Sequence, residues 1–286
     1  MTSLIQCVPN FSEGRDAGII SAIVEVVRQT PGVRLVDWSA DQDHNRLVVT
    51  FVGPPEPVCT AALAAAAAAI EKIDLRVHQG VHPRLGALDV LPFVPLTDIT
   101  LAQCVEIARS VGAKLAARHD LPVFLYEATS PAALSLPFVR KAAFQPLLPD
   151  YGPDTPHPTA GAAVVGAREP LIAYNVNLAT SDVSVARTIA RELRGSDTLP
   201  GIRALGLRLP SRGITQVSMN ITQPARIPLL AVFRHIERRA LELGTSITES
   251  EVIGALPGGT AFGVLTDALR SLGLKPGQVL LENWPE

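Results

Sequence analysis

Residues 77–86 concentrate side chains that could carry out acid–base chemistry. The segment reads VHQGVHPRLG and combines His78, His82 and Arg84 with glycines and a proline that prevent regular structure. Imidazole is the side chain best suited to proton transfer near neutral pH. A surface turn with incidental histidines is the alternative, and this pattern alone does not decide between the two interpretations.

The same histidines have the HxxxH spacing that binds zinc when it lies on a helix. Gly80 and Pro83 exclude that helix, and the glutamate of the metalloprotease motif is missing. Asp41, Asp43 and His44 are also potential ligands, but a solvated polar turn explains them as well. We therefore expect no metal site.

Two further segments could hold an anionic or polar ligand. Residues 8–15 form a polar loop after an expected strand, where ligand groups often lie, or they cap the next helix through Ser12 or Glu13. Arg46 follows Asn45 at the start of another expected strand and could bind a carboxylate with both ends of its guanidinium. A surface salt bridge is an equally good explanation of this arginine.

Residues 152–161 (GPDTPHPTAG) are rich in proline and glycine and precede an expected strand. Gly161 and Gly166 would allow the backbone to approach a flat ligand closely, although a linker is the alternative. The cysteines Cys7, Cys59 and Cys104 fall in expected strands and helices without a neighbouring base. Their small number predicts no disulfide framework and suits a reducing compartment.

The elements that must position these residues predict an α/β fold. Residues 171–178, 181–194, 202–209, 214–221, 228–243 and 246–252 read as β-α-β-β-α-β, the split ferredoxin-like pattern. The first half opens in the same order and adds an αβ unit. We therefore predict two related subdomains, residues 1–178 and 179–286. Residues 130–159 are expected to be irregular, and residues 258–272 to form a short helix in the tail.

Composition narrows the classes of function. The 286 residues are 47% hydrophobic and 18% charged, with a net charge of −2, which argues against nucleic-acid binding. No signal peptide is visible, and the most apolar stretch is too short to span a bilayer, so we expect a cytoplasmic protein without membrane contact. Phosphate-binding and dinucleotide-binding glycine motifs and the GxSxG elbow are absent from the sequence.

An ordered set of segments from residue 4 to residue 257 resembles the glutamate formiminotransferase family. Each segment is weakly specific alone, but the ordered set is highly specific. The segments are CVPNFSEGR (7–15), DHNR (43–46), TFVG (50–53), GVHPRLGALDV (80–90), PFVP (92–95), PVFLY (122–126), GAR (166–168), AYNVNL (173–178) and QVSMN (216–220).

The resemblance implies a fold of two α/β subdomains with a ligand crevice between them. It also implies transfer of a formimino group from N-formimino-L-glutamate to N5 of tetrahydrofolate, the co-substrate, in histidine degradation. A stand-alone transferase is expected, without the cyclodeaminase domain found in some members. A homodimer is a further expectation, since exposed sheet edges invite pairing.

The resemblance also implies roles for individual residues. The histidine of the GxHPRxG loop, here His82, transfers protons as base and then as acid. Arg46, Arg84 and Arg168 are alternative ligands for the two glutamate carboxylates. The full set expected to contact substrate is Asn10, Asp41, His44, Arg46, Arg84, Arg168, Asn175 and Asn177, and the set expected to contact folate is Gly152, Pro153, His157, Thr159 and Gly161.

Two departures from the family pattern leave the identity of the donor open. Ser39 replaces an acidic residue of mammalian members, and residues 140–145 (RKAAFQ) differ from an RxGxYE-like pattern. Formyl transfer between 5-formyltetrahydrofolate and glutamate would need the same attack and the same proton shuttle. A folate-binding protein without catalysis is the alternative from another class, against which His82 and its flanking glycines count.

Overall fold

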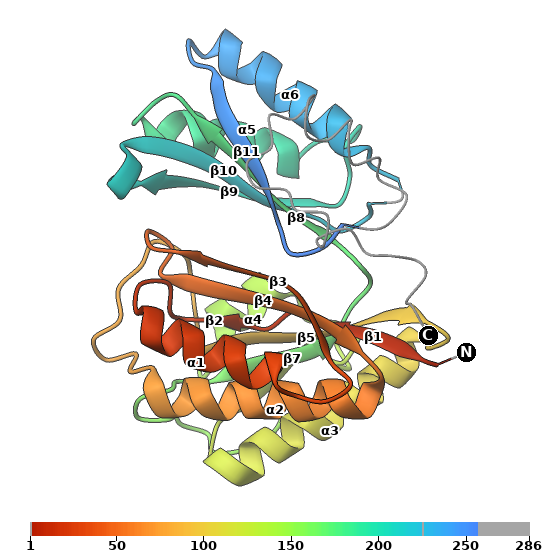
Figure 1. Cartoon of the computed structure of the whole chain (residues 1–286). Helices are drawn as coiled ribbons and strands as arrows, with labels where there is room; N and C mark the ends of the chain where they lie inside the picture. The colour runs from red at the N-terminus through yellow and green to blue at the C-terminus, as the bar shows by residue number, and fades with distance from the viewer. Residues whose placement is uncertain (1, 225, 257–286) are drawn as a thin grey trace. The chain divides into compact units, whose positions relative to one another are not determined.

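The computed structural model describes residues 2–224 and 226–256, which fall into two compact units, Met1–Glu169 and Pro170–Glu286 (Figure 1). The division comes before the boundary predicted between residues 178 and 179. The reason is that β8 (Ile172–Leu178) forms its hydrogen bonds within the sheet of the second unit. The helix predicted over residues 258–272 lies outside the described residues.

The first unit is a mixed seven-stranded sheet with helices. Its strand order is β3-β4-β1/β2-β5-β7-β6, in which β7 is parallel to β5 and β6 and the other pairs are antiparallel. The strands are β1 (Leu4–Cys7), β2 (Asn10–Phe11), β3 (Arg34–Asp41), β4 (Arg46–Gly53), β5 (Leu88–Thr97), β6 (Val123–Glu127) and β7 (Ala163–Ala167). The helices are α1 (Ala17–Arg28), α2 (Pro55–Lys72), α3 (Leu101–His119) and α4 (Leu136–Ala142).

The predicted ferredoxin-like order is present in this unit. Taken as one strand interrupted at Pro9, β1/β2 is followed by α1, β3, β4, α2 and β5, which is β-α-β-β-α-β. The extra αβ unit is α3 with β6, and β7 then inserts between β5 and β6. Helix α3 is capped by Thr100, whose side chain forms a capping box with Gln103.

Helices α1, α2 and α3 cover one face of the first sheet (Figure 1). Seven buried residues of the alanine-rich α2 belong to this core, including Ala61, Ala65 and Ala69. A smaller apolar cluster joins Val139 of α4 to Phe124 and Tyr126 of β6. The prediction that residues 130–159 are irregular is therefore wrong in part. They contain the short helix α4, which Ser135 caps and which Val139 anchors in the core.

The second unit is a four-stranded antiparallel sheet with two helices. Its order, β11-β8-β10-β9, is that of a ferredoxin-like β-α-β-β-α-β fold and confirms the prediction for this half. Alternate residues of β8, such as Tyr174 and Val176, pack in the core with both helices, whereas Asn175 and Asn177 alternate with them. The further elements are α5 (Val183–Arg194), β9 (Ile202–Leu209), β10 (Ile214–Ile221), α6 (Leu229–Glu242) and β11 (Ile247–Ile253).

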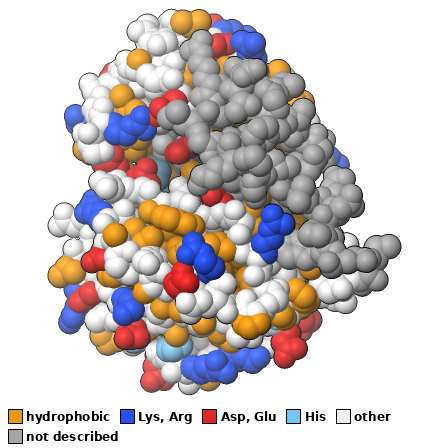
Figure 2. Space-filling model, viewed as in Figure 1, with side chains coloured by type: hydrophobic (Ala, Val, Ile, Leu, Met, Phe, Trp, Pro, Cys, Tyr) orange, Lys and Arg blue, Asp and Glu red, His pale blue; other side chains and the backbone are white. Residues whose placement is uncertain are grey.

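The surface carries both signs of charge. Figure 2 shows basic and acidic side chains interspersed over the visible face of the described residues, in line with the net charge of −2. Within the described ranges, no helix has the length and apolar character that a membrane span requires.

Candidate active site

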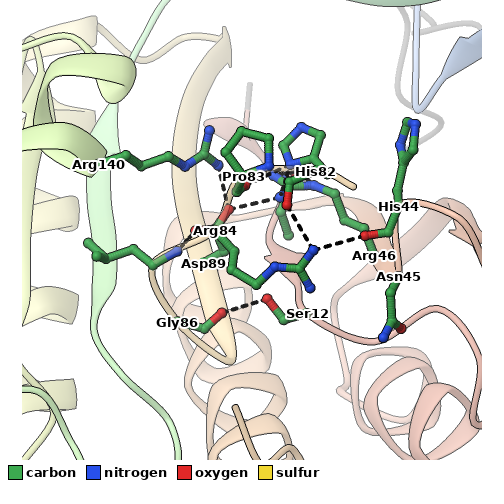
Figure 3. A network of polar contacts seen from close by, with 12 residues as sticks. Ser12, His44, Asn45, Arg46, His82, Pro83, Arg84, Gly86, Asp89 and Arg140 are labelled. Carbon is green, nitrogen blue, oxygen red and sulfur yellow. Dashed lines mark hydrogen bonds and ion pairs between the residues drawn. The ribbon is translucent and has the colours of Figure 1, made fainter. Parts of the chain in front are cut away.

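Three loops of the first unit meet at one end of its sheet, and Asn45 joins them (Figure 3). Its Oδ1 accepts a hydrogen bond of 2.8 Å from the Gly14 amide, and its Nδ2 donates one of 2.9 Å to the Gln79 carbonyl. Asn45 is buried and has a left-handed backbone with φ of 47°, a conformation that asparagine tolerates better than most residues. The loop after β2, the β3–β4 turn and the histidine loop are thereby fixed to one another.

Two glycines allow the backbones of these loops to touch. A Cβ at Gly14 would lie 2.2 Å from the Asp41 carbonyl oxygen, and one at Gly80 would lie 2.3 Å from that of His44. Both contacts are with backbone, so neither can be relieved by a change of side-chain rotamer. Gly14 and Gly80 thus serve close packing of the protein's own chain.

We expect Asn45→Ala to lower the free energy of unfolding by about 2–4 kcal/mol, because it removes two buried hydrogen bonds and leaves alanine in a left-handed conformation. Urea denaturation followed by circular dichroism measures this loss. Asn45→Asp keeps the acceptor for Gly14 and removes the donor to Gln79, so its loss should be smaller. Equal stability of the Ala variant and the parent would contradict the role of Asn45 as the joint.

Arg84 holds the histidine loop in shape. Its Nη2 donates to the carbonyls of His82 (2.8 Å) and His44 (3.2 Å), and its Nη1 contacts the ring of His78. His78 Nε2 donates to the Asn45 carbonyl at 3.1 Å, which leaves Nδ1 as the acceptor for Arg84. Burial and the Arg84 charge lower the pKa of His78. Arg84 and His78 therefore form a structural pair behind the loop.

Asp89 is the buried anion at the centre of the site. It lies at the start of β5 and is fully buried; its Oδ1 accepts a 2.7 Å hydrogen bond from the Leu85 amide. Its Oδ2 accepts from Arg46 Nη1 at 2.8 Å and from Arg140 Nη2. Burial alone would raise the pKa of Asp89, but the charges and hydrogen bonds of Arg140 and Arg46 outweigh it and the pKa is lowered. One carboxylate thus serves two guanidinium groups.

Arg46 is held on two sides. Its Nε and Nη2 donate to Asn10 Oδ1 at 3.0 and 2.7 Å, while Nη1 donates to Asp89. Asn10 is oriented in turn, because its Nδ2 donates to the Val8 carbonyl at 2.7 Å. Burial is the main cause that lowers the pKa of Arg46, to about 10, although the Asp89 charge opposes it. Arg46 stays protonated at neutral pH.

His82 lies next to this cluster. Its Nδ1 is 2.8 Å from the Pro83 carbonyl oxygen and 3.0 Å from Arg46 Nη1. The Pro83 carbonyl can only accept and the Arg46 guanidinium can only donate, so the two contacts favour opposite tautomers. We assign the hydrogen of the neutral ring to Nδ1 because the contact with Pro83 is the shorter one. Nε2 then carries the lone pair, and it has no hydrogen-bond partner in the described part of the chain. The ring of His44 lies 5.7 Å away, centroid to centroid.

The surroundings of His82 keep its imidazole neutral. Its pKa is lowered well below the ordinary value of 6.5, chiefly because burial penalises the charged ring and next because the Arg46 and Arg140 charges repel it. The side chain is only half-buried, but the charges of Arg46 and Arg140 lower the pKa of His82 in addition to burial. At pH 7 the ring is therefore a base that is free to accept a proton.

The other residues predicted to contact the donor lie in different surroundings. Asp41 Oδ1 accepts from the His44 amide at 2.7 Å and so closes the β3–β4 turn. Arg168 donates to the Glu169 carbonyl at 3.0 Å and hydrogen-bonds Tyr126. Within the described residues, no group of three His, Cys, Asp or Glu side chains is placed to hold a metal ion.

Asn175 and Asn177 belong to the second unit. Their Nδ2 atoms donate to Glu251 (3.0 Å) and Glu249 (2.8 Å), and Gln216 Nε2 donates to Asn177 Oδ1 at 3.0 Å. These side chains form a polar row across β10, β8 and β11.

The predicted folate segment lies within the first unit. His157 Nδ1 accepts from the amides of Thr159 (3.3 Å) and Ala160 (3.0 Å), and Gly161 pairs with Gly86 at the base of the histidine loop. Gly161 has φ of 68°, and a Cβ there would lie 2.4 Å from the Leu85 carbonyl oxygen. Gly161 thus permits close contact between two segments of the chain, residues 157–161 and the histidine loop. Gly152 and Pro153 are exposed.

The predicted site omitted Asp89 and Arg140. Asp89 has a signal in the sequence, since it is a carboxylate within an otherwise apolar strand (ALDVLPFV). Such a residue is seldom buried without a charged partner. Arg140 has no comparable signal, because it comes from a seven-residue helix in a proline-rich segment. Of the two interpretations of residues 8–15, the one in which Ser12 or Glu13 caps the next helix is wrong, because Asp16 caps α1 and Ser12 donates to the Gly86 carbonyl.

Comparison with known proteins agrees with the resemblance. Residues 4–168 match the family described as "Formiminotransferase domain, N-terminal subdomain", and residues 173–265 match "Formiminotransferase domain". The chain is 42% identical to glutamate formimidoyltransferase of Streptococcus pyogenes, over 90% of each chain. It is 36% identical to that of Thermoplasma acidophilum, over 97% of this chain and 96% of the relative.

A longer relative matches over part of its length. The formimidoyltransferase-cyclodeaminase of Rattus norvegicus is 38% identical over 90% of this chain, which covers 51% of the relative. The two family matches together span both units of the structure and leave the linking residues 169–172 between them. The chain therefore belongs to the formiminotransferase family.

Proposed function

We propose that this protein transfers a formimino group from N-formimino-L-glutamate to N5 of tetrahydrofolate, with His82 as the group that moves the proton. The family and the names of its relatives support the reaction. The observation that carries the role of His82 is its geometry: Nδ1 is anchored on the Pro83 carbonyl, and Nε2 of a neutral ring has no partner in the described residues.

The reaction needs one proton to pass between two nitrogens. N5 of tetrahydrofolate attacks the amidine carbon of the donor and forms a tetrahedral intermediate. His82 Nε2 accepts the N5 proton and then delivers it to the glutamate nitrogen, whose bond to carbon breaks. The products are 5-formiminotetrahydrofolate and glutamate, so atoms and charge balance. The guanidinium groups of Arg46 and Arg140 make the imidazolium a stronger acid, which favours the second transfer.

The folate contacts remain a proposal for residues 152–161. The exposure of residues 152–156 and the pairing of Gly161 with Gly86 support this assignment, because they connect an accessible segment to the base of the His82 loop. The row with Asn175 and Asn177 stays a proposed substrate contact of the second unit. Cytoplasmic location, a homodimer and a crevice between the subdomains stay predictions.

The identity of the donor can be tested directly. The purified protein is incubated with tetrahydrofolate and either formiminoglutamate or formylglutamate, and the folate product is identified by mass spectrometry. We expect formiminoglutamate to be the better substrate, as the names of the relatives suggest. Faster transfer from formylglutamate would favour the formyl reaction. Folate binding without transfer from either donor would favour a protein without catalysis.

A further inference from the structure

We propose that Arg140 binds a carboxylate of the donor's glutamate moiety, and that Asp89 and Arg46 hold its guanidinium group in place. This inference rests on the proposed function, because it concerns the substrate of the same site. It replaces Arg46, Arg84 and Arg168, the three arginines that the resemblance leaves as alternatives, with an arginine that the sequence did not suggest.

The other arginines are already engaged by the protein. All the guanidinium nitrogens of Arg46 have a partner in Asn10 or Asp89. Both terminal nitrogens of Arg84 contact the backbone or ring atoms of the histidine loop. Arg168 is shared between the Glu169 carbonyl and Tyr126. A ligand carboxylate would have to compete with these contacts.

Arg140 has unused hydrogen-bonding capacity. Its Nη2 donates to Asp89 Oδ2, its Nε is buried without a partner, and Nη1 has no partner among residues 2–224 and 226–256. Buried donors are nearly always paired, so the unpaired nitrogens Nε and Nη1 of Arg140 indicate a missing acceptor. The side chain is 13% exposed. It is therefore accessible to a ligand but mostly removed from water, where a charge-assisted hydrogen bond is strong.

The charges of the site also require an anion. Asp89 balances one of the two guanidinium groups that bind it, and the neighbouring His82 is neutral. The main electrostatic influences on the pKa of Arg46 are the single anion Asp89 and the cations Arg140 and Arg84. An uncompensated cation in a partly buried cluster is costly, so an arriving carboxylate gains the favourable energy of neutralising it.

Arg140 is also connected to the proton shuttle. Arg140 Nη2 and Arg46 Nη1 share Asp89 Oδ2, and Arg46 Nη1 lies 3.0 Å from His82 Nδ1 (Figure 3). A carboxylate bound at Arg140 would thus be fixed in the same rigid network as the imidazole. Fixing one end of the donor in this way is the alignment that a reaction between two bound substrates needs.

The test compares Arg140→Gln with Lys141→Gln. Lys141 is the next residue of α4, and its exposed side chain gives a control with the same loss of charge. We expect Arg140→Gln to raise KM for formiminoglutamate roughly 10- to 100-fold, the range that loss of a charged hydrogen bond produces. KM for tetrahydrofolate should change little. Unchanged donor KM in a folded Arg140→Gln protein would overturn the inference.

Donor analogues separate binding from a structural effect. Formiminoglutamate with one carboxylate converted to an amide should be a poorer substrate of the parent protein, for one of the two possible positions. Arg140→Gln should lose this discrimination between acid and amide, because its partner charge is gone. Discrimination as strong in the variant as in the parent would assign the carboxylate to another residue.

A binding measurement distinguishes failure of the inference from failure of the proposed function. Calorimetry with L-glutamate, the product, needs no turnover. If the parent protein transfers no group but binds glutamate through Arg140, the proposed reaction fails and the inference stands. If the parent transfers the group and Arg140→Gln binds glutamate as well as the parent, the inference fails alone.

Discussion

We expect the His82→Ala protein to fold like the parent and to lose roughly 10²–10⁴-fold in kcat, the usual contribution of a positioned general acid–base group. The ring is half-buried and its own contacts are with Pro83 and Arg46, so its removal leaves the joint at Asn45 intact. Initial rates with saturating donor and tetrahydrofolate measure the loss, and circular dichroism verifies the fold. His119→Ala, in the last turn of α3, is the matched control.

The pH dependence tests the same assignment independently. Because burial, Arg46 and Arg140 lower the pKa of His82, kcat/KM should stay on its plateau as the pH falls through 6.5 and decline only at lower pH. A bound anionic donor favours the protonated ring, so the acid limb of kcat should lie at higher pH than that of kcat/KM. An acid limb of kcat/KM centred at or above 6.5, or full turnover by His82→Ala, would contradict the shuttle.

The fold was predictable where strands alternate cleanly. In β8, the apolar Tyr174 and Val176 alternate with Asn175 and Asn177, and the observed strand, Ile172–Leu178, has almost the predicted limits. The domain boundary was placed after this strand instead of before it, because hydrophobic periodicity identifies a strand but not the sheet that it joins. Helix α4 is not evident from the sequence, because its seven residues include a proline and give too little periodicity.

The site was predictable in its loops and not in its charges. The imidazoles, Arg84 and the glycines of residues 77–86 stand together in the sequence, and their concentration in one irregular segment was visible. Which arginine is free depends on hydrogen bonds between segments far apart in the chain. Arg140 and Asp89 are 51 positions apart, and Arg46 and Asp89 are 43 apart. The hydrogen-bond partners of each guanidinium group are therefore known only once the structure is known.

The second large effect concerns Asp89. We expect Asp89→Asn to lower the free energy of unfolding by about 3–5 kcal/mol, since removing one partner from a buried ion pair leaves uncompensated charge. Here two guanidinium groups, of Arg46 and Arg140, would lose their common anion. Urea denaturation at pH 7 measures the loss. Asp197→Asn, at an exposed position of the second unit, should stay within about 0.5 kcal/mol of the parent.

The stability difference should also depend on pH in a defined direction. The folded-state pKa of Asp89 is lowered from the ordinary 3.8, so its carboxylate contributes stability above the unfolded-state pKa and loses it as the pH falls through the lower, folded-state value. The difference between the parent and Asp89→Asn should therefore shrink below about pH 4. A difference that stays constant down to pH 2 would show that charge is not its cause.

A double variant separates the two guanidinium groups. Arg140→Gln alone leaves the Arg46–Asp89 pair intact and should cost less stability than Asp89→Asn. The double variant Asp89→Asn with Arg140→Gln lacks one of the two cations that Asp89→Asn leaves without an anion. Its loss in free energy of unfolding should therefore be smaller than the sum of the losses in the two single variants. Strict additivity would mean that Arg140 and Asp89 do not stabilise each other. In that case Asp89 would position Arg46 alone, and a guanidinium held loosely at position 140 would give a much weaker site for a carboxylate.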